Sequence, residues 1–298
     1  MAITGNRRKL ANFSGEPFLR YFILPELFTN IGRFIHNNIE EKGGIGAILQ
    51  FFKSESGGFM VENLVILFLF IVGLCLGSFL NVLVYRLPRK RSLLWPPSSC
   101  PHCQHRLAAS DLIPLVSHLW LKGRCRYCQQ LISLSYFMIE LITGIFTVVW
   151  VVHFRNEPGG ELWRLFLGYL LIVIAIIDLK TYLIPNDLIY PALLGGLIYR
   201  WSQGELQSAL IGALVGGGLL FSIYLLYPKG MGMGDIKLLT LLGVFLGGYG
   251  VLQALFWSSL SGVIILVPLV LSGRIRRQQP VPFAPFLALG TFVVLFWG

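Results

Sequence analysis

Long apolar runs separated by short polar segments make up most of the chain after residue 60. Several runs approach the length of about 20 residues that an α-helix needs to cross the hydrocarbon core of a bilayer. Lipid also requires every backbone N–H and C=O group to be paired within the helix. The pattern therefore predicts an all-α polytopic membrane bundle of about eight transmembrane helices. The expected spans are Leu64–Val84, Tyr136–His153, Leu162–Ile177, Asp187–Tyr199, Gln207–Leu226, Leu238–Gly250, Leu252–Leu271 and Pro282–Trp297.

The composition agrees with a membrane protein, because 55% of the residues are hydrophobic and only 13% are charged. The mean hydropathy is +0.71. A net charge of +10 would by itself also suit a nucleic-acid-binding protein. The basic residues, however, gather in short loops beside the apolar runs, at Arg86–Arg91, Lys122–Arg126 and Arg274–Arg277. Such loops mark the cytoplasmic side of a membrane, so we expect the lipid bilayer, and no nucleic acid, as a partner.

Residues 1–59 differ from the rest of the chain in having mixed charge, an amphipathic stretch interrupted by Pro25 and a Ser- and Gly-rich end. Met60 could be an independent start. We interpret 1–59 as an N-terminal extension, either a fused expression segment or tag or a native addition, and 60–298 as the membrane domain. The extension lacks an apolar core near its start, so it is not expected to be a cleavable signal peptide.

A polar insert at 86–133 follows the first span and carries two Cys-x-x-Cys pairs. The pairs are Cys100 with Cys103 and Cys125 with Cys128. Their pattern matches a small zinc ribbon, in which four thiolates hold Zn²⁺ tetrahedrally. Disulfides are the alternative, but the basic flanks place the insert in the reducing cytoplasm. His102 or His105 could replace a thiolate, although four cysteines are the simpler set of ligands.

The stretch between the two pairs, residues 104–124, is 21 residues long. Its apolar side chains are expected to form a small hydrophobic core for the insert. These are Leu112, Ile113, Leu115 and Trp120. Because all four ligand positions are Cys, the predicted metal site is closed and structural, with no open coordination position. Cys75 lies within the first span, and we interpret it as a packing residue.

Two acidic residues stand at the boundaries of apolar runs. Asp178 follows the run 165–177, and Asp235 follows the Gly-rich stretch 230–234. A carboxylate beside membrane-spanning sequence is costly and usually faces a cavity or a partner, and the predicted topology brings both to the cytoplasmic face. Two adjacent carboxyl groups share a proton, so one can activate water while the other polarises a carbonyl. The alternative is a loop in which Asp235 merely caps the next helix.

Other polar residues near the spans admit simpler interpretations. Glu140 lies in the first turns of the second span, either solvated near the interface or lining the cavity of the two aspartates. Asp187 is interpreted as a helix cap or a partner of the helix dipole. A stripe of small and polar residues in the first span predicts close helix packing. The stripe consists of Gly73, Gly77, Ser78 and Asn81.

Taken together, the motifs resemble those of the type IV prepilin peptidases, or leader peptidases, of type IV pilus and type II secretion systems. The resemblance covers residues 60–298. It rests on Gly77-Ser78-Phe79-Leu80-Asn81 with Arg86-Leu87-Pro88, the two Cys pairs, Asp178 with Ile184-Pro185-Asn186, Gly232-Met233-Gly234-Asp235-Ile236-Lys237, and Pro282-Phe283-Ala284-Pro285-Phe286-Leu287-Ala288. A lone Gly-x-Gly-Asp is a weak signal, but these five motifs in order are specific.

The resemblance implies an endopeptidase that removes the basic leader of prepilins or pseudopilins after a Gly, at the cytoplasmic face of the bacterial inner membrane. It implies that Asp178 and Asp235 are the catalytic pair. Residues expected to bind substrate or support the pair are Gly232, Gly234, Lys237, Glu140 and Lys180. The resemblance also implies a structural zinc ion and methylation of the new N-terminus from S-adenosylmethionine, although no residue pattern indicates a methyltransferase site.

Three other functions fit parts of the pattern. An intramembrane aspartyl protease of the presenilin type shares the Gly-x-Gly-Asp but would not be expected to carry the Cys insert. A transporter or channel could use the two aspartates to bind cations. A catalytically inactive scaffold of a secretion machine would leave two costly carboxylates without a use.

Overall fold

The computed structural model describes residues 58–93, 95–154, 161–228, 232–273 and 280–297. The predicted N-terminal extension therefore lies almost wholly outside the described residues. The longer helices are α4 (Gly58–Arg86), α6 (Leu134–Phe154), α7 (Glu161–Thr181), α8 (Asn186–Ser202), α9 (Leu206–Leu226), α10 (Met233–Leu271) and α11 (Ala284–Trp297). The short ones are η1 (Leu87–Arg89), η2 (Ala109–Leu112) and α5 (Val116–Trp120).

The described part of the chain is helical apart from loops and two isolated β-bridges. Five of its helices are long and apolar enough to cross a membrane, namely α4, α6, α7, α9 and α10, and α11 is a shorter apolar helix. Many large apolar side chains point outward from these helices, among them Phe68 and Leu214. Because exposed apolar surface on this scale is unfavourable in water, the chain is a multi-pass membrane protein and the predicted all-α class is confirmed.

Helix α10 is two helices joined at Gly247. This residue has φ 72° and ψ −179°, a conformation that glycine adopts without steric cost. Gly250, just after the junction, lies close to Val294 near the end of α11. Gly262 lies close to Phe286 near the start of α11. The second part therefore runs antiparallel to α11, and the longer helices comprise eight helical segments in the described residues. Of these, α8 is not among the helices that are long and apolar enough to count as a candidate span.

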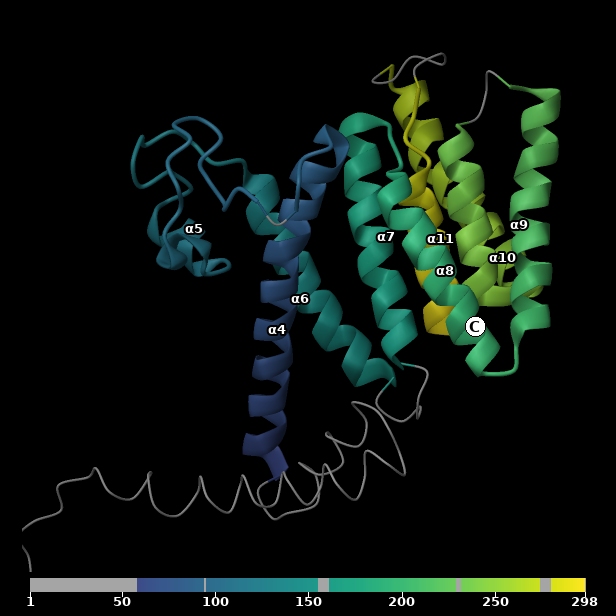
Figure 1. Ribbon diagram of the computed structural model, residues 1–298, viewed down its shortest axis with the longest axis horizontal. Coiled ribbons are helices and arrows are strands. Elements are labelled where there is room, and N and C mark those ends of the chain that lie inside the picture. The colour runs from purple at the N-terminus through teal and green to yellow at the C-terminus, as the bar shows by residue number, and fades with distance from the viewer. Residues whose placement is uncertain (1–57, 94, 155–160, 229–231, 274–279, 298) are drawn as a thin grey trace, which may run out of the picture.

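Two groups of buried apolar side chains hold the bundle together. The larger group is centred on the first part of α10, where Leu238, Leu239, Leu241 and Leu242 are fully buried, and it extends over α7, α8 and α11. The smaller group joins α4, α6 and α7. Figure 1 shows the resulting order, with α4 and α6 at one edge, α7 in the middle and α9 at the far edge.

Small residues let the helices approach closely, as predicted for the stripe in α4. A side chain at Gly73 would overlap Thr147 of α6, and one at Gly77 would overlap Thr143. Asn81, which is buried, donates a hydrogen bond from Nδ2 to the carbonyl oxygen of Tyr136 at 3.0 Å. These residues therefore fasten α4 to the start of α6 by packing and by one buried hydrogen bond.

The closest approach of α9 and α10 yields a stability prediction. A Cβ at Gly212 would overlap the carbonyl oxygen of Gly243, whereas a Cβ at Gly218 would meet nothing within 4 Å. We expect Gly212→Ala to destabilise the bundle by about 1–3 kcal/mol, because backbone cannot move aside as a side chain can. Thermal unfolding in detergent measures this effect. Gly218→Ala, on the same helix, is the matched control, and equal melting temperatures for the two variants would contradict the assignment.

Candidate active site and metal centre

Asp178 lies near the C-terminal end of α7, the end that the sequence predicts to face the cytoplasm, and is only 5% exposed. Most of the residues that precede it, from Leu167 to Ile177, are buried and fix this end of the helix in the bundle. Its Oδ2 accepts a hydrogen bond from the backbone N–H of Ala284 at 3.0 Å, and the N–H of Phe283 also donates to the carboxylate. The first N–H groups of a helix have no partner within it, so the start of α11 provides the donors that hold Asp178.

Asp235 lies in the first turn of α10, three residues after the N-cap Gly232. Its carboxylate accepts a hydrogen bond from the N–H of Gly232 and lies close enough to Asp178 for the two charges to interact. The two aspartates are thus brought together from α7 and α10. The N-cap position of α10 is taken by Gly232, so Asp235 is an acid of the first turn and not the N-cap residue of this helix.

The two glycines of the motif leave room beside Asp235. A Cβ at Gly232 would lie 3.3 Å from Oδ2 of Asp235, and a Cβ at Gly234 would lie 3.1 Å from the Cβ of Ile184. Gly234 therefore packs α10 against the segment that follows α7. Gly232 is exposed, and its missing side chain keeps one side of the carboxylate open.

Lys237 fixes the same segment from the other side. Its Nζ donates a hydrogen bond to Oδ1 of Asn186 at 3.0 Å and lies 5.4 Å from the centre of the Tyr190 ring. The cation thus joins α10 to the first turn of α8 and is directed at neutral partners. Asp187, in the same turn, is exposed, and the N-cap position is taken by Pro185. The carboxylate of Asp187 is therefore positioned to interact with the dipole of α8 and is not its N-cap.

The two remaining predicted residues make contacts elsewhere. Lys180, exposed at the end of α7, donates from Nζ to Oγ of Ser135 at 3.2 Å. Glu140 is half-buried on α6, and its Oε2 accepts a hydrogen bond from the backbone N–H of Leu115 at 2.9 Å. The side chains of Ser78 and Asn81 also bond to this carboxylate. Glu140 thus links α4, α6 and the insert.

The link between Glu140 and Leu115 can be tested by hydrogen exchange. We expect Glu140→Ala to speed amide exchange in residues 112–120 by about tenfold, because a hydrogen bond to a charged acceptor contributes roughly 1.5–3 kcal/mol. Mass spectrometry of the exchanged protein in detergent micelles measures the change. Glu140→Gln keeps an acceptor oxygen and should be less affected. Unchanged exchange in Glu140→Ala would show that the insert is held by its other contacts.

The four cysteines converge in the insert. Their Sγ atoms all lie within 4.8 Å of one another, and those of Cys100 and Cys128 are 3.9 Å apart. The backbone N–H of Cys128, together with that of Tyr127 and against the effect of burial, lowers the pKa of Cys125 to about 7. Four thiols at this spacing are a set of ligands for a soft or borderline metal ion, so the cluster can bind a metal.

The two Cys pairs fold into matching turns. The N–H of Cys100 bonds to the carbonyl oxygen of His105 at 3.0 Å, and the N–H of Cys125 bonds to that of Gln130 at 2.9 Å. The residue after each second cysteine has a positive φ, 55° at Gln104 and 59° at Gln129. Both sequences thus build the same turn, which aims two thiols at one point. His105 instead packs against the ring of Tyr127.

Sequence reasoning missed one part of the aspartate site, the amide donors at the start of α11. The sequence predicts the motif Pro282–Ala288 as the start of the last span, but it does not predict that the N–H groups of Phe283 and Ala284 face Asp178. Proline just before or within the first turn marks the start of a helix, where free N–H groups are available, so this end could have been considered as a source of donors.

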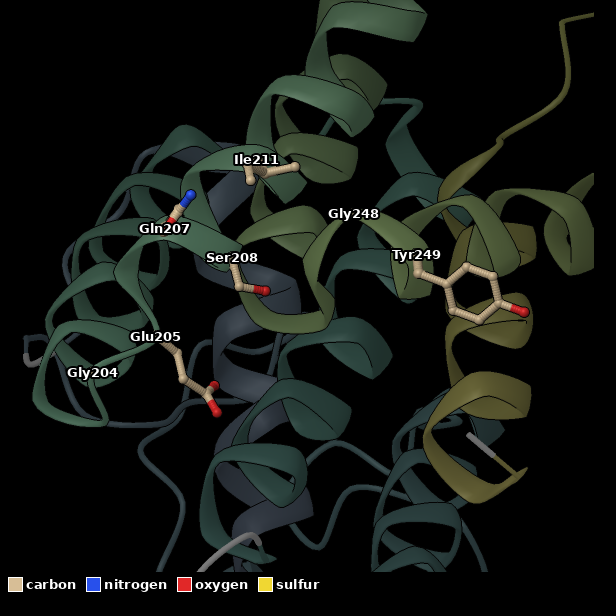
Figure 2. A pocket seen from close by; sticks show the side chains of 7 residues that line it. All are labelled: Gly204, Glu205, Gln207, Ser208, Ile211, Gly248 and Tyr249. Atoms are coloured by element: carbon tan, nitrogen blue, oxygen red, sulfur yellow. The ribbon is translucent and has the colours of Figure 1, made fainter.

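A shallow groove lies at the opposite end of the bundle. Figure 2 shows its lining side chains, which come from the α8–α9 connection, from α9 and from the residues just after Gly247. The lining residues are Gly204, Glu205, Gln207, Ser208, Ile211, Gly248 and Tyr249. None of the predicted site residues lines it. Its acid Glu205 forms an ion pair with Arg200. The residues that line the groove therefore include one ion-paired carboxylate and no pair of carboxylates comparable to Asp178 and Asp235.

Two family models match the chain. One, described as the bacterial peptidase A24 N-terminal domain, matches residues 71–154, which include the four cysteines. The other, described as the type IV leader peptidase family, matches residues 165–267, which include both aspartates. No solved structure matches the chain at a significant level.

Several curated proteins are similar over most of the chain, and each is named prepilin leader peptidase/N-methyltransferase. The protein from Aeromonas salmonicida (strain A449) is 38% identical over 262 residues, which cover 77% of this chain and 89% of the relative. That from Pectobacterium carotovorum subsp. carotovorum is 36% identical over 258 residues, covering 74% and 88%. That from Burkholderia pseudomallei (strain 1026b) is 34% identical over 263 residues, covering 78% and 85%.

Proposed function

The chain belongs to the type IV leader peptidase family and is a prepilin peptidase, and from this premise we propose that Asp178 and Asp235 are its catalytic pair. The observation that carries the proposal is that Asp178, held by backbone N–H groups at the start of α11, lies close enough to Asp235 for the two charges to interact. Two carboxylates placed together at the edge of a membrane bundle are costly unless they are used.

The proposed reaction is hydrolysis of the peptide bond between the leader and the mature prepilin. One ionised carboxylate takes a proton from water as the oxygen attacks the scissile carbonyl carbon, while the other, protonated, donates to the carbonyl oxygen. Return of a proton to the amide nitrogen then releases the new N-terminus and the leader. Gly232, exposed and without a side chain beside Asp235, gives an extended substrate backbone room to approach.

We place this chemistry at the cytoplasmic face of the bacterial inner membrane. The end of α7, the start of α10 and the metal-binding insert lie toward the same end of the bundle (Figure 1), and this end carries the basic run from Arg86 to Arg91. Basic loops stay in the cytoplasm. A substrate with a basic leader and an apolar helix would present its cleavage site at that interface.

Two cofactors belong to the proposal. The closed set of four thiols fits Zn²⁺ as a structural ion for the insert, bound by Cys100, Cys103, Cys125 and Cys128. The names of the relatives also include N-methyltransferase, and we propose that this chain likewise methylates the newly exposed amine from S-adenosylmethionine. In this scheme residues 60–298 form the enzyme, 86–133 its metal-binding insert and 1–59 a separate extension.

The test is cleavage of a purified prepilin by the full chain reconstituted in liposomes. Mass spectrometry of the product should show an N-terminus directly after the leader Gly and, when S-adenosylmethionine is present, the mass of one added methyl group. Cleavage without any methylation would remove the second activity and leave the first. If purified and folded protein cleaved no prepilin, a cation-binding role of the aspartates would have to be considered instead.

A further inference from the structure

The small core that the sequence predicts for the insert does not form, because three of its four expected residues, Leu112, Ile113 and Trp120, are exposed and Leu115 is only partly buried. Val116, Leu119 and Trp120 of α5 are 51%, 65% and 82% exposed. They are spaced i, i+3 and i+4, so they share one face of the helix. The opposite face is turned inward, where His118 lies 5.4 Å from the ring of Phe137 on α6. An exposed apolar face of this kind requires a partner.

The position of α5 along the bundle indicates which partner. Leu115, its N-cap residue, bonds to Glu140, which lies six residues after the start of α6 and therefore about 9 Å along that helix. Glu140 is level with Gly77, whose side chain would meet its Cα, and α4 continues beyond this level to Arg86. Figure 1 accordingly shows α5 beside α4 and α6 and not above their ends.

The charges around α5 suit an anionic surface. Lys122 and Arg124 follow the helix directly, and both are exposed. A short element with Trp and Leu on its outer face and basic residues at its end has the composition of a segment that lies in the membrane interface. Each Lys or Arg near an anionic leaflet contributes about 1 kcal/mol to binding.

We propose that the insert is seated on the membrane, with Val116, Leu119 and Trp120 buried in the interfacial region of the cytoplasmic leaflet and Lys122 and Arg124 against the phosphates of anionic phospholipids. The metal-binding turns are then carried on a base that is fixed to the lipid as well as to α6. The occupant of the apolar face is lipid, because this face lies level with the membrane helices and not in the aqueous phase above them.

Photocrosslinking tests this assignment in the full chain and without substrate, so its outcome is independent of the peptidase activity. Benzoylphenylalanine is placed at position 120 in protein reconstituted in vesicles of phosphatidylcholine with phosphatidylglycerol. We expect phospholipid adducts at about tenfold higher yield than from the same probe at His102, an exposed position in the first metal-binding turn, because only the apolar face enters the interface. Metal content verifies that both labelled proteins are folded.

Further experiments distinguish lipid from a protein partner at this apolar face. Lys122→Asn should lower the adduct yield at position 120 about fivefold in vesicles with phosphatidylglycerol and leave it unchanged in pure phosphatidylcholine, given the contribution of one basic residue. Adducts to a second copy of the chain, or to prepilin when it is added, in place of lipid would overturn the proposal. So would a yield at position 120 no higher than at position 102, since the face would then be in water.

Discussion

Replacement of either Asp178 or Asp235 with Asn is expected to lower the rate of prepilin cleavage by about 10³-fold or more, since each carboxyl group moves a proton in the reaction. An amide can neither accept the proton of the attacking water as a base nor supply one to the carbonyl oxygen as an acid. The double variant should be little slower than the single ones, because residues that act as a unit have non-additive effects. Initial rates in liposomes, measured from product formation, test all three variants.

The variants are expected to fold, which makes the result interpretable. Asn at position 178 keeps an oxygen that can accept the N–H of Ala284, the partner of Asp178 at 3.0 Å. Asn at position 235 likewise keeps an acceptor for the N–H of Gly232. Asp187→Asn is the matched control, since Asp187 is an exposed acid in the first turn of α8. Cleavage at the normal rate by Asp178→Asn or Asp235→Asn would refute the catalytic pair.

The aspartate pair could be predicted from the sequence because two simple constraints apply to it. Acids beside apolar runs are rare, and the basic loops orient every span, so Asp178 and Asp235 had to reach one face. The donors at the start of α11 could not be predicted in the same way. The N–H of Ala284 reaches Asp178 across 106 positions of sequence, and such a contact depends on how the helices pack and not on any local pattern.

The insert shows where hydrophobicity alone misleads. Trp120 and Leu112 are apolar residues in a polar segment, and in water they would form a core, but both are exposed. A sequence pattern indicates that a side chain avoids water, but it does not indicate whether that side chain is buried in protein or in lipid. Glu140 illustrates the same limit for polar residues, because its partner, the N–H of Leu115, is a backbone group that no residue type reveals.

Cys125→Ser should release the metal from the insert while the aspartate site survives. Cys125 is 1% exposed, and its sulfur lies within 4.8 Å of the other three thiols. Removal of a direct ligand should weaken metal binding by more than about 100-fold, since even outer-shell changes cost 10- to 100-fold. We expect about one Zn²⁺ per wild-type chain by elemental analysis, as in a four-thiolate site, and none retained by the variant after dialysis.

Loss of the metal should also unfold the turns that it joins, because a closed site of this type contributes directly to folding. Trypsin should then cut at Lys122 or Arg124 about tenfold faster, as cleavage follows the population of the open form. Cys75→Ser is the control, since Cys75 lies in α4 outside the cluster.

The aspartates are held by α7, α10 and α11, so prepilin cleavage by Cys125→Ser should stay within about tenfold of wild type. This loss is smaller than the one expected from removing a catalytic acid or base. A variant that kept its metal and its resistance to trypsin would disprove the four-cysteine site. One that lost cleavage as completely as Asp178→Asn would show that the insert, and not only the helical bundle, shapes the peptidase site.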